Sequence, residues 1–161
     1  MKAALFVALL ALAGMAGAAE LRPFDAGSPR AIGQAQAGKP YVLVLWSLYC
    51  EPCREEMGRW GPLQKKYPGV AFVLVSTDLP QDRAAVGEFL KRHDLGRVQS
   101  WVFADEFVER VRYAIDPAWR GELPRTYLFD ASHRSTPYSG ILDRKTLEGW
   151  LAKQRPRPSA K

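Results

Sequence analysis

The two cysteines of the chain stand three residues apart, in the segment Cys50-Glu51-Pro52-Cys53. An apolar, β-rich run, Tyr41–Trp46, precedes them, and a segment that can form a helix follows. A disulfide across so short a loop stabilises a fold little by loop closure, because that stabilisation grows with loop length. Two thiols at this spacing, at a strand-to-helix junction, are instead typical of a redox-active pair.

Zinc is an alternative ligand of such a pair. Two thiolates supply half of a tetrahedral site, so His93 and His133 would have to complete it. The chain lacks the second paired motif of common zinc sites, and both histidines stand among polar residues, as solvent-exposed side chains do. The redox interpretation is therefore preferred, and we expect neither a metal nor a cofactor other than the disulfide itself.

Residues 1–19 have the layout of a secretory signal peptide. Lys2 supplies the positive charge, residues 3–12 are apolar, and Ala16-Gly17-Ala18 offers a cleavage site, with cleavage after Ala18 or Ala19. The alternative is an uncleaved membrane anchor, although the run is short for a span of about 20 residues. The sequence thus predicts export to the periplasm or another extracytoplasmic compartment, where disulfides persist.

Residues 20–154 suit one domain with one core. The remaining segment, 155–161, is basic and lacks apolar residues, so we expect it to be a disordered tail. It contributes to an excess of 23 basic over 17 acidic residues, a formal charge of +6. Such a tail can contact anionic lipid or nucleic acid, but export argues against nucleic acid. We expect a monomer.

The pattern along the domain alternates between helices and strands. We expect an interruption at Gly61-Pro62 within one helix and Asp82 as the cap of another. The expected helices span 28–37, 51–67, 82–93, 105–113 and 143–153, and the expected strands span 41–46, 70–76, 99–104, 126–130 and 135–141. The last two strands form a hairpin. This order predicts an α/β fold with a central mixed β-sheet and helices on both faces.

The chemistry expected of the pair divides between its two thiols. At the N-terminal edge of a helix, Cys50 faces unpaired backbone N–H groups, which favour the nucleophilic thiolate. Cys50 would attack a disulfide, Cys53 would resolve the mixed disulfide, and Pro52 suits the first helical turn. Negative charge from Glu51 and Glu56 would raise the pKa of the thiolate and make the pair a better reductant.

The sequence leaves two roles open for Glu56. Three residues after Cys53 on the same helical face, it can exchange a proton with that thiol. It can equally be an ordinary acid of the helix that neutralises Arg54 or Arg59.

Pro124 directly precedes the strand expected at 126–130. A cis proline there would expose the backbone of Leu123 beside the thiols, where an extended substrate segment can pair with it. A generic trans loop proline is the alternative. The residues expected to contact a partner surround the cysteines: Trp46, Tyr49, Glu51, Pro52 and Leu123.

Two segments together, 46–57 and 123–130, resemble the TlpA/ResA branch of exported thioredoxin-like proteins, and the Cys-Glu-Pro-Cys sequence resembles the ResA subgroup. The resemblance extends from Lys39 to the final helix. It implies a thioredoxin fold, a cis Pro124, a glutamate at Glu56 that tunes the cysteines, and a low-potential thiol–disulfide reductase. Members of this branch reduce apocytochrome c or copper-site assembly proteins, and a membrane thiol transporter supplies their electrons.

The chain also departs from that branch. Val44 stands six residues before Cys50, where an acid or amide is usual. The segment before Lys39 is short, and the 115–122 loop, which contains Trp119 and Arg120, is long; we expect Trp119 to pack onto the domain.

Two other functions remain open: a disulfide oxidase or isomerase, and a Cu(I)-handling module that uses both thiolates.

Overall fold

The computed structural model describes residues 21–154, so the expected signal peptide and basic tail lie outside the described residues. Six strands form one sheet in the order β1-β4-β3-β2-β5-β6. They are β1 (Arg22–Phe24), β2 (Tyr41–Trp46), β3 (Ala71–Ser76), β4 (Gln99–Phe103), β5 (Arg125–Phe129) and β6 (Ser135–Ser139). The first four are parallel to one another, whereas β5 is antiparallel to both β2 and β6. The predicted mixed sheet with a terminal hairpin is confirmed.

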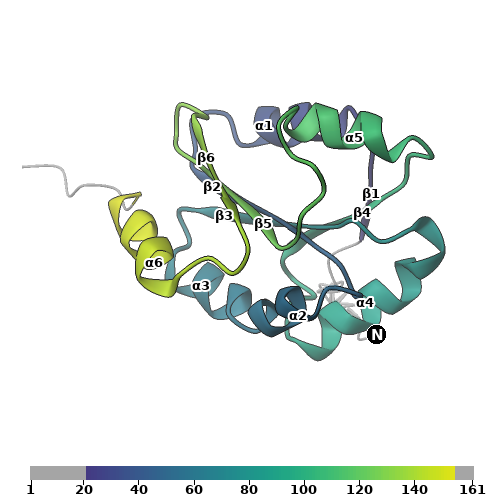
Figure 1. Ribbon diagram of the computed structural model, residues 1–161. Coiled ribbons are helices and arrows are strands. Elements are labelled where there is room, and N and C mark those ends of the chain that lie inside the picture. Colours follow the sequence, from purple (N-terminus) through teal and green to yellow (C-terminus); the bar gives the residue numbers. More distant parts are fainter. Residues whose placement is uncertain (1–20, 155–161) are drawn as a thin grey trace, which may run out of the picture.

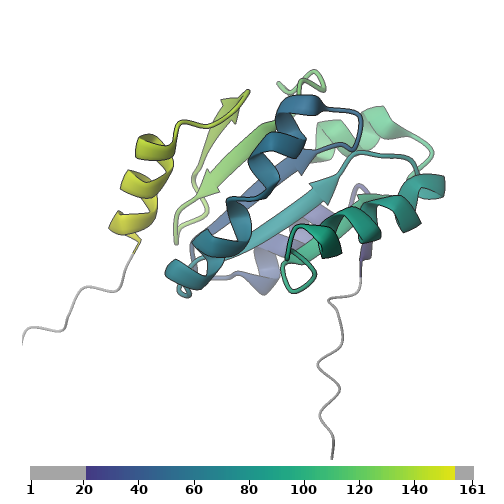
Figure 2. The ribbon, with the colours of Figure 1, turned by 90° about the horizontal axis from the view of Figure 1, so that it is seen from below.

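Helices cover both faces of this sheet (Figure 1). They are α1 (Ser28–Ala35), α2 (Glu51–Met57), α3 (Trp60–Lys66), α4 (Arg83–Arg92), α5 (Val108–Ile115) and α6 (Arg144–Lys153). Helices α1 and α5 lie on one face, and the other four lie on the opposite face. Figure 2 shows α6 at the edge of the sheet formed by β5 and β6. Within residues 21–154, no helix is long and apolar enough to span a bilayer.

The continuous apolar sequence of β2 follows from its central position. Successive side chains of a strand point to opposite faces, so a strand covered on both sides needs apolar residues throughout. Val42, Val44 and Trp46 enter the core under α2, α3, α4 and α6, while Leu43 and Leu45 enter the core under α1 and α5. All six residues of β2 are buried. The strand that ends next to the cysteines is thus held on both faces.

The helix expected over 51–67 is two helices, so the interruption expected from Gly61-Pro62 is present, but its position differs. The break falls at Gly58 and Arg59, one turn earlier. A proline has no N–H to donate to the carbonyl four residues back, and its ring clashes with that carbonyl. For Pro62 the carbonyl belongs to Gly58, so the helix stops there and restarts with Pro62 in its first turn.

Three other local predictions need correction. Asp82 occupies the N-cap position of α4 but makes no side-chain cap, because a 3₁₀ turn, Pro80–Asp82, precedes the helix and its backbone is helical (φ −83°, ψ −2°). The helix expected over 105–113 begins only at Val108, and Phe107 precedes it and is 64% exposed. The short strand β1 was missed, since three residues give too little periodicity to recognise. It pairs with β4 at the sheet edge.

Candidate active site

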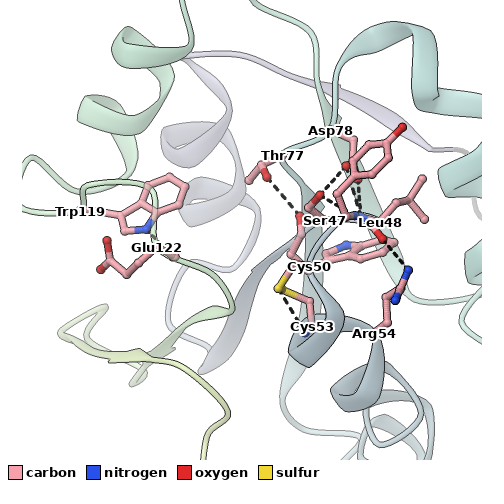
Figure 3. The surroundings of a disulfide bond; sticks show 11 residues. Ser47, Leu48, Cys50, Cys53, Arg54, Thr77, Asp78, Trp119 and Glu122 are labelled. Atoms are coloured by element: carbon pink, nitrogen blue, oxygen red, sulfur yellow. Dashed lines mark hydrogen bonds between the residues drawn. A yellow bond between two sulfur atoms is a disulfide. The ribbon is translucent and has the colours of Figure 1, made fainter.

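Cys50 and Cys53 form a disulfide at the start of α2, directly after the β2 strand and its short loop (Figure 3). Cys50 is the N-cap residue of α2, and its Sγ accepts a hydrogen bond from the Cys53 N–H at 3.2 Å. Its side chain is partly exposed, whereas Cys53 is only 1% exposed. An incoming partner can therefore reach the Cys50 sulfur, and the Cys53 sulfur stays behind it.

The Leu123–Pro124 peptide bond is cis, as expected from the sequence. Because β5 runs antiparallel to β2, with Leu45 opposite Arg125, this bond lies at the same end of the sheet as the cysteines. The Pro124 carbonyl accepts from the Gly140 N–H at 2.8 Å. Within the described chain, the Leu123 backbone makes no hydrogen bond, so its N–H and C=O are available to an extended segment.

Four of the five residues predicted to contact a partner reach the surface around this site. Tyr49 is 79% exposed, Glu51 and Pro52 are exposed, and Leu123 is partly exposed. Trp46 is different: its side chain is 1% exposed and packs against Phe89, with ring centroids 5.2 Å apart. Direct contact of Trp46 with a partner, as predicted, is therefore wrong. Trp46 supports the loop from the core.

Glu56 is buried one turn after Cys53 and is paired with Arg59. Its Oε1 also accepts from the Leu142 N–H at 2.8 Å, while Arg59 Nη1 donates to the Leu142 carbonyl at 2.6 Å. This arrangement ties α2 to the segment before α6. Among residues 21–154, Oε2 of Glu56 has no hydrogen-bond partner. Neutralisation of Arg59 is thus observed, and one carboxylate oxygen remains available for a proton.

Burial raises the pKa of the Glu56 carboxyl above its ordinary value, and the Arg59 charge and the Leu142 N–H offset only part of that rise. The folded protein therefore binds this proton more tightly than the unfolded chain does. Its stabilising contribution is complete below the ordinary pKa of 4.5 and is lost as the pH rises through the raised folded value.

We predict that the free energy of unfolding of the wild type, relative to Glu56→Gln, falls as the pH rises from about 4.5. Glutamine keeps the side-chain shape but does not titrate. Urea unfolding at a series of pH values measures this difference, and Glu55→Gln is the exposed matched control on the same helix. A difference that grows with pH would contradict the assignment.

Asp78 is a site residue that sequence reasoning missed. It follows β3, the strand next to β2, and is 4% exposed. Its carboxylate accepts hydrogen bonds from the Ser47 hydroxyl and from the Leu48 N–H, both in the loop that leads to Cys50 (Figure 3). The signal was present, because polar residues at the carboxyl ends of adjacent parallel strands meet at one sheet edge.

The loop before the cis proline is held by its own polar network. Arg125 bonds to Asp116 Oδ2 and Glu122 Oε1, each at 3.1 Å. Trp119 is 3% exposed and donates from Nε1 to the Glu122 carbonyl at 2.9 Å, so the expected packing of Trp119 onto the domain is confirmed. Figure 3 places Trp119 and Glu122 in the surroundings of the disulfide. The longer loop is therefore an ordered border of the site.

The zinc alternative required His93 and His133 beside the cysteines. His133 instead contacts the Gln36 carbonyl at 3.0 Å, and the His93 ring lies against Phe89. Within the part of the chain that the structure describes, no group of three or more His, Cys, Asp or Glu side chains is arranged to hold a metal ion.

The order of strands and helices, the Cys-x-x-Cys disulfide after β2 and the cis proline before β5 define a thioredoxin-like protein. None of the known protein-family models matches the chain. It is similar to thiol-disulfide oxidoreductase ResA of Bacillus cereus, with 28% identity over 121 residues, and to ResA of Bacillus anthracis, with 25% identity over 120 residues. Both matches cover 74% of this chain but 65% of the relative, so the chain spans slightly less than two thirds of the length of these proteins.

Solved structures show the same fold. A secreted Mycobacterium tuberculosis disulfide oxidoreductase homologous to E. coli DsbE has a TM-score of 0.60 and 22% identity, covering 75% of this chain and 86% of its own. StoA from Bacillus subtilis has a TM-score of 0.54 and 20% identity, covering 71% and 83%. The predicted thioredoxin fold and the resemblance to ResA are both confirmed.

Proposed function

We propose that the protein is an exported thiol–disulfide oxidoreductase that reduces disulfides in extracytoplasmic partner proteins. The observation that carries this proposal is the disulfide itself: a partly exposed Cys50 sulfur in front of a buried Cys53, next to the cis Leu123–Pro124 bond. The similarity to ResA, named a thiol-disulfide oxidoreductase, supports the same activity.

The reaction starts from the reduced pair. The Cys50 thiolate attacks one sulfur of the substrate disulfide, forms a mixed disulfide and releases the other substrate sulfur as a thiolate. Cys53 then loses its proton and attacks the Cys50 sulfur, which restores the Cys50–Cys53 disulfide and releases the second substrate thiolate. Two electrons pass from the protein to the substrate, and a separate thiol donor must reduce the protein again.

We assign supporting roles to three residues around the disulfide. The backbone of Leu123, without a hydrogen bond in the described chain and followed by cis Pro124, pairs with the substrate segment around the scissile disulfide. Glu56 accepts the Cys53 proton, because burial raises the pKa of its carboxyl and Oε2 is without a partner in the described chain. Before it takes up that proton, the negative charge of Glu56 disfavours the thiolates and makes the pair more reducing.

The finer assignment follows the family resemblance. The partners are apocytochrome c or copper-site assembly proteins, the electron donor is a membrane thiol transporter, and residues 1–19 direct export. The exposed aromatic side chain of Tyr49 beside Cys50 offers the partner an apolar contact.

The reduction potential of the pair tests the proposal. We expect equilibration with defined thiol–disulfide buffers to give about −270 mV or lower, near the value of thioredoxin. A potential near about −120 mV would instead indicate an oxidase and would remove the role given to Glu56. Stoichiometric Cu(I) binding that survives a competing chelator, without disulfide reduction, would favour the copper-handling alternative.

A further inference from the structure

The loop between β2 and α2 is held at almost every polar backbone group. The Trp46 carbonyl accepts from the Thr77 N–H at 2.9 Å, and the Ser47 carbonyl accepts from the Cys50 N–H at 3.2 Å. The Leu48 carbonyl accepts from Arg54 Nη1 at 3.1 Å. These hydrogen bonds help to fix the shape of the loop.

Asp78 is the centre of this network. Its Oδ1 accepts from the Ser47 hydroxyl at 2.6 Å, and its Oδ2 accepts from the Leu48 N–H at 3.0 Å (Figure 3). A third donor, the Ser76 hydroxyl at 2.6 Å, belongs to β3 and fixes the carboxylate to the sheet. The Ser47 hydroxyl in turn accepts from the Tyr49 N–H at 3.0 Å. The carboxylate therefore holds the three residues that directly precede Cys50.

The burial of Asp78 makes the loss of these hydrogen bonds costly. A carboxylate that is 4% exposed must keep its hydrogen-bond donors, since an unsatisfied buried charge is costly. Two of its three donors, the Ser47 hydroxyl and the Leu48 N–H, belong to the loop, so the loop cannot move without depriving the buried charge of both hydrogen bonds. With consecutive Cα atoms about 3.8 Å apart, the position of Leu48 restricts that of Cys50, two residues later.

We propose that Asp78 is a positioning residue of the redox site: acting through Ser47 and Leu48, it holds Cys50 where its sulfur meets that of Cys53. This inference rests on the proposed thiol–disulfide activity. Holding two reacting groups together raises their effective concentration, which favours closure of the disulfide and makes the dithiol a stronger reductant. Loosening the loop must therefore make the pair less reducing.

Two variants of the full-length protein test the inference by equilibration with reduced and oxidised glutathione. Ser47→Ala removes the hydroxyl that joins the carboxylate to the loop but keeps the negative charge. Asp78→Asn removes the charge and one acceptor while keeping the size of the side chain. For both we expect the equilibrium constant for disulfide formation to fall about tenfold, a rise in potential of about 30 mV.

Ser100→Ala is the matched control. Ser100 is 3% exposed on β4, and its hydroxyl bonds to the Val98 carbonyl at 2.9 Å, outside the Asp78 network. We expect it to lower the melting temperature as Ser47→Ala does, with an unchanged equilibrium constant. This contrast separates positioning from a general loss of stability.

The remaining outcomes overturn the inference. If only Asp78→Asn changes the equilibrium constant, the charge and not the position is responsible. If neither variant changes it, Asp78 serves stability alone. A wild-type protein that fails to exchange with glutathione would contradict the proposed function itself, which distinguishes the two failures.

Discussion

Replacing Cys50 with alanine is expected to abolish disulfide reduction, lowering the rate by at least about 10³-fold to the uncatalysed background. The remaining thiol cannot take over, because Cys53 is 1% exposed and lies behind the position of Cys50. Reduction of insulin by the protein and a dithiol donor measures the effect. Full activity of Cys50→Ala would show that the roles of the two cysteines are wrongly assigned.

Cys53→Ala is the matched variant, since it removes the other sulfur of the same pair. It leaves the attacking thiol in place but removes the group that resolves the mixed disulfide. Under non-reducing conditions this variant should therefore accumulate a covalent adduct with its partner that a reductant releases. The trapped partner then identifies the substrate directly by mass spectrometry.

The largest effect on stability is expected for Leu74→Ala, which should lower the free energy of unfolding by about 3 kcal/mol. Leu74 is 0% exposed in β3, where it stands between Val44 of β2 and Ser100 of β4. Removing its side chain leaves a cavity that rigid strands on both sides cannot fill. The loss is a large part of a typical domain stability of about 5–15 kcal/mol.

Urea unfolding followed by circular dichroism measures this change. Ile141→Ala is the matched control, because Ile141 is 52% exposed and its truncation should change the stability by no more than about 0.5 kcal/mol. Equal losses for the two variants would mean that β3 is not at the centre of the core. Since β3 also leads to Asp78, Leu74→Ala should in addition make the Cys50 loop less rigid.

Prediction from the sequence succeeded where the signal is local or periodic. The continuous apolar run of β2 placed this strand at its observed residues, and the alternation of elements gave the mixed sheet. The break between α2 and α3 was misplaced because the effect of Pro62 is exerted one turn before it, through the Gly58 carbonyl. A helix propensity that is assigned to each residue separately does not show that a proline ends the helix one turn before its own position.

Exposure is the property that the sequence predicted least well at the site. Trp46, next to the cysteine loop, was expected to contact a partner but is buried against Phe89 of α4. Which face of a strand is covered depends on helices far away in the chain. Tyr49, three residues later, lies beyond the end of the strand and outside that cover, at 79% exposure.

The sequence by itself determined the redox pair and its surroundings along the chain: two cysteines three residues apart, a strand before them, a helix after them and a proline before a later strand. The chemistry of the two cysteines depends on their spacing along the chain, which the sequence fixes directly. Only the tertiary structure brought Asp78 to Ser47 and Leu48, and Glu56 to Arg59 and Leu142, because the groups that hold the site come from neighbouring strands and a distant loop. Such contacts follow from strand order and register, which packing of the whole sheet decides.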